Sequence, residues 1–268
     1  MIRKLKNKFK RILNFNNQRF IEDQQYGWFG DYDSWQEAAN ECRGYDQDNI
    51  LEKVKNSLLK VKNGEAIYER DSVIFNHVEY SWPVLAMLLY TATENYNKLH
   101  VLDFGGSLGS SYFQNKVFLC HLSDITWNIV EQPHFVECGI INFQNDTLRF
   151  YNSITESMKS NKSDIVLFSS VLQYLHKPEE IINQVVKYKI KYIIVDITSF
   201  TCNATHRITV QRVWPEIYEA SYPCWFFNEQ MFLAMFEPYY SVINTFNPHC
   251  SSNLENTYYK GFILKFNA

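Results

Sequence analysis

From about residue 100 to its end, the chain alternates short apolar runs with amphipathic stretches. Five of these runs have the length of buried strands, and they cover residues 100–104, 126–132, 148–152, 164–170 and 191–197. Amphipathic stretches lie between most of them. This alternation is typical of right-handed βαβ units, so it predicts a parallel sheet with helices on both faces.

The last part of the chain has a different pattern. Residues 228–240 have helical periodicity, and two further apolar runs follow at 241–246 and 260–266 with a polar loop between them. Two strands that are joined without a helix form a hairpin, so the last strand must run antiparallel to its neighbour. The prediction is an α/β fold with seven strands, mostly parallel, and an antiparallel last strand.

The first third of the chain has helical patterning. Ser34, followed three residues later by Glu37, is a capping box that predicts a helix from about Trp35. A turn and a second helix are expected next, and residues 71–91 are amphipathic enough for a third. We therefore divide the chain into a basic arm (1–19), an N-terminal helical cap (20–95) and an α/β domain (96–268).

Charge is distributed unevenly along the chain. Residues 1–19 hold seven Lys or Arg and no acid, while the remaining residues carry 19 basic and 29 acidic side chains. The apolar residues of the arm fall on one helical face, which is typical of a helix lying on an anionic membrane surface. Docking to a protein partner, or no function at all, are the alternatives. The acidic body makes nucleic acid an improbable partner.

Composition narrows the class of protein further. A chain of 268 residues with 46% hydrophobic content can bury a sizeable core. The six cysteines include no CxxC pair and no His at metal-ligand spacing, so we expect free thiols in a reducing compartment and no metal site. We expect neither an export signal nor a membrane span. The predicted location is the cytoplasm, with possible attachment of the arm to the inner membrane face.

The strongest chemical signal is the stretch VLDFGGSLGSS at residues 101–111. Gly105 and Gly106 allow a sharp turn and a close approach of the backbone to a ligand, while Gly109 opens a helix whose amides favour an anion. Asp103 is unexpected in a loop that binds a pyrophosphate, because its charge would repel the phosphates. It suits a ligand that carries an ammonium and a sulfonium.

An acid follows the next predicted strand. Glu131 lies 22 residues after Gly109, near the spacing at which an acid reaches both hydroxyls of a cofactor ribose. A solvated strand end is the alternative explanation, but its position behind a glycine-rich loop favours ribose binding.

These residues resemble a known family. The segment DFGGSLG is similar to the acidic glycine-rich first motif of class I S-adenosylmethionine-dependent methyltransferases, and residues 163–182 resemble their fourth motif. More narrowly, VLDFGGSLGSSYFQN, IVEQPHFVECG, LFSSVLQYL and YPCW resemble the methyltransferase family of capsule and O-antigen polysaccharide gene clusters. The resemblance implies a Rossmann-like fold and S-adenosyl-L-methionine as cofactor. It also implies a small-molecule, nucleotide-sugar or glycan acceptor, in surface polysaccharide biosynthesis.

The resemblance also implies a set of cofactor-binding residues. The acid that usually contacts the adenine amino group after the third strand is missing, and Asn152 or Ser153 occupies that region. The position of the usual histidine pair after the fourth strand holds Gln173 and Tyr174. The predicted cofactor site comprises Asp103, Phe104, Gly105, Gly106, Ser107, Gly109, Glu131, Gln132, Asn152, Ser153, Ser169, Ser170 and Gln173.

A hydroxyl acceptor would benefit from a general base near the strand ends. Candidates are His176, Asp196 and His206, and each of them has a structural alternative as a capping, turn or exposed residue. Aromatic rings outside the sheet could stack on a sugar or a base, or could equally fill the contact between cap and core. The candidate substrate-binding residues are Trp28, Tyr174, Tyr222 and Trp225.

Other functions fit the sequence less well. A nicotinamide dehydrogenase would have G-x-G-x-x-G in place of GGSLG. A glycosyltransferase could use a D-x-D motif to bind a metal, but the two D-x-D motifs of this chain, at 31–33 and 46–48, do not follow a predicted sheet strand. The main alternative is a non-catalytic scaffold that keeps the cofactor-binding fold and docks polysaccharide-assembly enzymes at the membrane.

Overall fold

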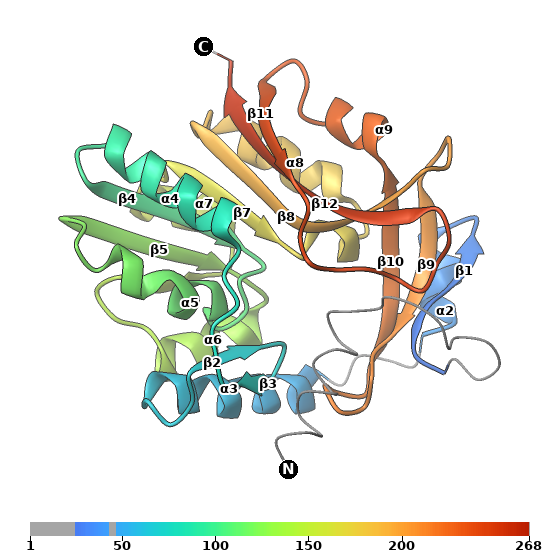
Figure 1. Ribbon diagram of the computed structural model, residues 1–268, viewed down its shortest axis with the longest axis horizontal. Helices are drawn as coiled ribbons and strands as arrows, with labels where there is room; N and C mark the ends of the chain where they lie inside the picture. The colour runs from blue at the N-terminus through green and yellow to red at the C-terminus, as the bar shows by residue number, and fades with distance from the viewer. Residues whose placement is uncertain (1–24, 43–46, 268) are drawn as a thin grey trace.

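The computed structural model describes residues 25–42 and 47–267, and its centre is a ten-stranded sheet (Figure 1). Seven of the strands are those predicted for the α/β domain, and they lie close to the predicted bounds. They are β4 (Lys98–Phe104), β5 (Asp124–Val130), β6 (Leu148–Tyr151), β7 (Ile165–Ser169), β8 (Tyr192–Thr201), β11 (Tyr240–Phe246) and β12 (Thr257–Phe266).

The order of these seven strands is β6-β5-β4-β7-β8-β12-β11. Neighbours from β6 to β8 pair parallel, whereas β12 is antiparallel to both β8 and β11. The predicted mostly parallel, Rossmann-like sheet with an antiparallel last strand is confirmed. The chain moves outward from β4 through β5 to β6 and then returns to β7 on the other side of β4. Ligands of open α/β sheets bind at such a reversal, beyond the carboxyl ends of the strands.

Helices cover both faces of the sheet. Ile165 and Leu167 of β7 pack in one apolar core, and Val166 and Phe168 pack in another on the opposite face. Burial on both faces explains why the central strands are continuous apolar runs. The first core includes side chains from α3 (Gln47–Lys62), α4 (Trp82–Glu94), α5 (Ser110–Leu119) and α6 (Pro133–Asn142), and the second includes side chains from α7 (Ile154–Ser160), α8 (Pro178–Lys187) and α9 (Glu229–Ala234).

Three further strands extend the sheet and were not predicted. They are β1 (Gly27–Tyr32), β9 (Arg207–Arg212) and β10 (Ser221–Asn228), which pair antiparallel in the order β1-β9-β10. The end of β10 joins β8 in parallel, through Phe227 beside Phe200. The predicted loop after the fifth strand is therefore a two-stranded insertion, which lies beside the carboxyl end of β8 (Figure 1).

The expectation of a helix starting at residue 71 was wrong. β2 (Tyr68–Arg70) and β3 (Val73–Phe75) form a hairpin, and α4 begins only at Trp82, with Pro83 in its first turn. The two turn residues, Asp71 and Ser72, have φ of 49° and 65°. Two consecutive positive φ angles are typical of the tight hairpin turn whose twist matches that of the strands. The region predicted as a helical cap thus also contains strands.

The predicted capping box is confirmed. α2 runs from Trp35 to Asn40, and its first turn is capped by the Oγ atom of Ser34, which accepts the backbone N–H of Glu37 at 3.2 Å.

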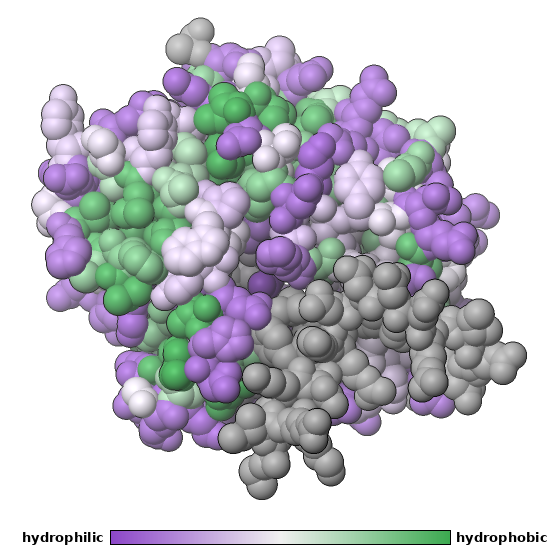
Figure 2. All heavy atoms as spheres, viewed as in Figure 1, coloured by the Kyte–Doolittle hydropathy of each residue, from purple (hydrophilic) through white to green (hydrophobic). Residues whose placement is uncertain are grey.

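The basic arm, residues 1–19, lies outside the described residues. Figure 2 shows a surface on which hydrophilic side chains mix with separate apolar patches. None of the described helices has the length and apolar character needed to cross a membrane.

Candidate active site

A cavity of about 520 Å³ lies at the reversal in strand order, at the carboxyl ends of β4, β5 and β7 and beside the middle of β8. Segments that are far apart in the sequence form its walls, because the β2–β3 hairpin and the β9–β10 insertion both reach the edge of the sheet. The polar lining residues that matter below are Glu69, Arg70, Asp71, Asp103, Ser107, Ser110, Gln114, Glu131, Gln132, Ser169, Ser170, Tyr174, Asp196, Gln211, Tyr218 and Tyr222.

The glycine-rich loop after β4 is closely packed. Gly105 has a φ of +72°, and a Cβ atom there would lie 2.4 Å from Cγ2 of Val171. A Cβ atom on Gly106 would lie 2.5 Å from the carboxyl carbon of Asp103. The loop therefore passes directly over that carboxyl group, an arrangement that only residues without a side chain allow. Gly109, at φ +108°, then opens α5.

Asp103 is buried beneath this loop, with 1% of its surface exposed. The Nε1–H group of Trp127 donates to Oδ2 of Asp103 at 2.9 Å. Burial raises the pKa of Asp103 to about 7, and repulsion from Glu131 acts in the same direction. A buried acid with one neutral donor pays a desolvation penalty that a cationic ligand would relieve.

Glu131 follows β5 and faces the glycine-rich loop. Its Oε1 accepts the backbone N–H of Ser107 at 3.3 Å, and its Oε2 accepts that of Gln132 at 2.7 Å. Burial raises the pKa of Glu131, although these two hydrogen bonds oppose the shift. The backbone donors fix the carboxylate, and each oxygen keeps a lone pair for a further donor.

Asp196, in the middle of β8 and beside the last residue of β7, is a second buried acid and has 3% of its surface exposed. Its Oδ2 accepts a hydrogen bond from Oγ of Ser169 at 3.2 Å, while its Oδ1 has no hydrogen-bond partner among the described residues. Burial raises the pKa of Asp196, and the positive charge of Arg70 lowers it in part.

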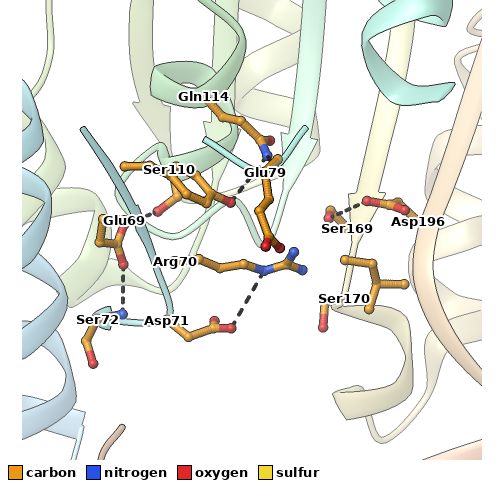
Figure 3. Close-up of polar contacts among 12 residues, drawn as sticks. Glu69, Arg70, Asp71, Ser72, Glu79, Ser110, Gln114, Ser169, Ser170 and Asp196 are labelled. Carbon is orange, nitrogen blue, oxygen red and sulfur yellow. Dashed lines mark hydrogen bonds and ion pairs between the residues drawn. The ribbon is translucent and has the colours of Figure 1, made fainter. Parts of the chain in front are cut away.

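The β2–β3 hairpin adds charged residues that the sequence analysis missed. Glu69 is buried and accepts hydrogen bonds from Oγ of Ser110 at 2.6 Å and from the backbone N–H of Ser72 at 2.7 Å (Figure 3). Ser110 is the first residue of α5, so Glu69 connects the hairpin to the helix that follows the glycine-rich loop. Burial raises the pKa of Glu69 to about 7.

Arg70 is the only Lys, Arg or His that lines the cavity within the described part of the chain. Figure 3 shows its side chain extending from the hairpin toward Ser170 and the Ser169–Asp196 pair. Its Nε lies 3.8 Å from Oδ2 of the exposed Asp71, too long for a hydrogen bond. The cavity thus combines five carboxyl groups with a single guanidinium.

Most of the predicted cofactor-binding residues lie together at the cavity. Five others lie beside or away from it. Phe104 packs on Phe168, and Gly109 is buried under α5. Gln173 is buried and donates to the carbonyl of Ile197 at 3.0 Å. Asn152 and Ser153 are exposed, and Ser153 caps α7. The predicted residues in the lining are Asp103, Gly105, Gly106, Ser107, Glu131, Gln132, Ser169 and Ser170.

Of the three candidate bases, Asp196 alone lines the cavity. His176 is exposed and stacks on Trp35 at a ring distance of 5.6 Å. The Nδ1 atom of His206 accepts the backbone N–H of Asn228 at 2.9 Å, and burial lowers the pKa of its ring. Neither histidine lines the cavity, and neither has the environment that was its alternative, because His176 is exposed and caps no helix and His206 is partly buried.

The candidate substrate-binding aromatics divide in the same way. Tyr174 and Tyr222 line the cavity, with their rings edge to face and centroids 5.1 Å apart. Trp28 is buried against Phe226, and Trp225 stacks on Trp35 while its Nε1–H donates to the carbonyl of Leu175. Trp28 and Trp225 therefore fill the contact between β1, α2 and the insertion.

Comparison with known proteins gives no family assignment. No protein-family model matches the chain, and no curated protein matches it. The narrower resemblance to the capsule and O-antigen family is therefore still a prediction.

Among solved structures, the chain is similar to Burkholderia thailandensis 1,6-didemethyltoxoflavin-N1-methyltransferase, which was crystallised with 1,6-didemethyltoxoflavin and S-adenosylhomocysteine. Identity is 11%, the match covers 94% of this chain and 100% of that one, and the TM-score is 0.47. An S-adenosylmethionine-dependent methyltransferase from Clostridium acetobutylicum has 10% identity over 69% of this chain and 91% of its own, with a TM-score of 0.44. Similarities at this level are too weak to assign an activity, and the Rossmann-like fold follows from the strand order of the chain itself.

Proposed function

We propose that this protein is an S-adenosylmethionine-dependent methyltransferase that acts on a hydroxylated small-molecule or sugar-type acceptor. The observation that carries the proposal is a pair of acids, the buried Asp103 and the half-buried Glu131, on either side of a glycine-rich turn where the strand order reverses. No Lys, Arg or His among the described residues contacts either acid through an ion pair.

The charge of the cavity favours a cationic cofactor over a dinucleotide. A pyrophosphate site needs donors and positive charge, whereas the lining has five acids and one arginine among the residues that the structure describes. The described residues also contain no group of three or more His, Cys, Asp or Glu side chains placed to hold a metal ion. A ligand with an ammonium and a sulfonium would let the buried carboxyls ionise, and that gain contributes to its binding.

The cofactor side of the cavity comprises Asp103, the glycine-rich loop and Glu131. Gly105 and Gly106 bring the backbone close enough for the amino-acid end of the cofactor to lie near Asp103. Glu131, fixed by two backbone donors, would accept the two ribose hydroxyls. Gln132 and Phe135 line the cavity beyond Glu131, where an adenine ring would follow.

The acceptor side comprises Arg70, Asp196, Tyr174, Gln211 and Tyr222. When bound, S-adenosylmethionine supplies a methyl group activated by the positive sulfur. Asp196 is placed to accept the proton of an acceptor hydroxyl through its unpaired Oδ1, and Ser169 holds the other oxygen. Positioning of the acceptor in a shielded cavity supplies most of the rate, and the base adds to it.

Binding of the cofactor tests this proposal. Isothermal titration of the full chain should show S-adenosylmethionine and S-adenosylhomocysteine binding in the micromolar range or tighter. Glu131→Ala should weaken both by about tenfold or more, because a buried acceptor of two hydrogen bonds is lost. Asp146→Ala, an exposed acid in the α6–β6 loop, is the matched control. No binding by the wild-type protein would end the methyltransferase proposal.

A role in surface polysaccharide biosynthesis is a finer part of the proposal, supported by the resemblance of the sequence motifs to that gene-cluster family. Turnover on nucleotide sugars or glycans would support it. Cofactor binding without turnover on any of them would favour the non-catalytic scaffold. Deletion of residues 1–19 followed by sedimentation with anionic liposomes at low salt tests whether the arm binds a membrane.

A further inference from the structure

Two oppositely charged groups face each other across the acceptor side without forming an ion pair. Asp196 presents a buried Oδ1 atom that has no hydrogen-bond partner among the described residues. Arg70 approaches from the β2–β3 hairpin, and its recorded ion pair, with Asp71, is long and exposed. Arg70 and Asp196 are close enough for their charges to interact but are not within 4 Å of each other.

Arg70 and Asp196 both line the acceptor side of the cavity. Its walls are hydrogen-bonding side chains, since the OH of Tyr174 donates to Oε1 of Gln211 at 2.8 Å and the ring of Tyr222 lies beside Tyr174. Ser170 and Gln211 also line the cavity. A purely apolar acceptor would leave Oδ1 of Asp196 without a hydrogen-bond partner, which costs free energy.

An arginine is unexpected in a site built for a cation. The cofactor would bring a positive charge into the same cavity, so a second cation at Arg70 is unfavourable unless an anion accompanies it. Asp196 compensates for Arg70 only while it is ionised, and as a general base it becomes neutral when it takes up a proton. An anionic group on the acceptor would balance Arg70 throughout the reaction.

We propose that the methyl acceptor is a hydroxylated anion, in which a carboxylate or phosphate binds Arg70 while the hydroxyl to be methylated donates its hydrogen bond to Oδ1 of Asp196. This inference rests on the proposed methyltransferase function. In the transfer, the hydroxyl proton passes to Asp196 as the oxygen bonds to the methyl carbon. The sulfur–methyl bond breaks, and its electron pair stays on the sulfur of the departing S-adenosylhomocysteine.

Binding to the protein saturated with S-adenosylhomocysteine separates this inference from the proposed function. The probes are D-glucuronate, D-galacturonate and D-glucose 1-phosphate, with D-glucose as the neutral counterpart, and their binding is followed by titration calorimetry and saturation-transfer NMR. At least one anionic probe should bind the wild-type protein tenfold or more tightly than D-glucose. Preference for the uronates would identify a carboxylate as the ligand of Arg70, and preference for the sugar phosphate would identify a phosphate.

Variants assign the preference to Arg70. Arg70→Gln should lose the advantage of the anionic probes by tenfold or more and leave the affinity for S-adenosylhomocysteine within about twofold. Arg149→Gln, on the far strand β6, should behave like the wild-type protein. With an acceptor that is methylated, Arg70→Gln should raise KM more than it lowers kcat, because Arg70 binds the anionic group. If Arg70 only lowers the pKa of Asp196, the variant would instead shift the pH profile of kcat equally for anionic and neutral acceptors.

Two results would overturn the inference while leaving the methyltransferase proposal intact. One is binding of S-adenosylhomocysteine with no preference of the wild-type protein for any anionic probe. The other is equal binding of the anionic probes by the wild-type protein and Arg70→Gln. Failure of S-adenosylhomocysteine to bind would instead remove the proposed function itself.

Discussion

The two sides of the cavity are constructed in different ways. The acids and glycines of the cofactor side come from two short segments, 103–109 and 131–132, each directly after a central parallel strand. The acceptor side combines Arg70 from a hairpin, Asp196 from the middle of β8, and Gln211 and Tyr222 from an insertion. Local sequence therefore specifies the cofactor side, and tertiary contacts specify the acceptor side. The same sheet can keep one cofactor while its inserted segments change the acceptor.

The acceptor side should be most sensitive at Asp196. Asp196→Asn removes the group that accepts the hydroxyl proton but can keep the hydrogen bond from Ser169. We expect kcat to fall by about 10²- to 10⁴-fold, the usual contribution of a general base. Release of S-adenosylhomocysteine from a competent acceptor measures this effect. Unchanged cofactor affinity in the same variant would show that the two sides act independently, whereas unchanged kcat would remove Asp196 from the mechanism.

The cofactor side should be most sensitive at Asp103. Asp103→Asn keeps an acceptor for Trp127 but removes the charge that would meet the ammonium. The loss of one partner of a buried charged pair costs about 2–5 kcal/mol. We therefore expect the Kd for S-adenosylmethionine to rise by about 100-fold or more in titration calorimetry. A change of less than threefold would contradict the placement of the cofactor.

The same variant should be more stable than the wild-type protein when no ligand is bound. The pKa of Asp103 is about 7 in the folded protein, above the ordinary value of 3.8. The protonated carboxyl therefore favours the folded state, and this contribution is fully present below about pH 4 and is lost as the pH rises through 7. At pH 8 the wild type buries an uncompensated charge that Asp103→Asn lacks. Thermal melts should show a gain of several degrees in Tm at pH 8 that disappears near pH 4.

Cofactor affinity should depend on pH for the same reason. A cation binds the ionised form of Asp103, so between pH 5 and 7 the Kd should fall by up to tenfold for each unit of rising pH. Glu69 also has a pKa of about 7, so the titration belongs in a Glu69→Gln background. The contribution of Asp103 is the difference in the slope of log Kd against pH between the Glu69→Gln variant and the Glu69→Gln, Asp103→Asn double variant. A Kd that does not change with pH in the Glu69→Gln variant would contradict this account.

What the sequence could predict follows the same division. The seven predicted strands of the α/β domain are apolar runs, and the acids at the carboxyl ends of β4 and β5 stand at spacings set by the βαβ repeat. Glu69 and Arg70 gave no such signal, because their hairpin depends on the positive φ angles of Asp71 and Ser72 in a segment that also has helical periodicity. Their partners are distant in sequence, so no short motif contains them.

The insertion did carry a local signal that the sequence analysis missed. Residues 207–212, RITVQR, alternate polar and apolar positions, and the apolar Ile208 and Val210 are buried, as is Thr209 between them. Such alternation predicts a half-buried strand. The role of this strand at the site could not be predicted. Gln211 contacts Tyr174 because β9 pairs with β10 and because the turn after β7 brings Tyr174 beside them, and neither arrangement is visible in the sequence.

The smallest expected effect concerns a histidine that the sequence placed at the site and the fold did not. His176 is exposed and stacks on Trp35, and it does not line the cavity. His176→Ala should therefore leave kcat within about twofold of the wild type, since the loss of a surface stacking contact costs about 1 kcal/mol of stability at most and no reacting group. Trp35→Leu is the matched control for that contact, because it removes the stacking partner and keeps the imidazole. A tenfold or larger loss of kcat in His176→Ala, but not in Trp35→Leu, would mean that the acceptor reaches the imidazole ring. The acceptor side would then extend beyond the cavity toward α2.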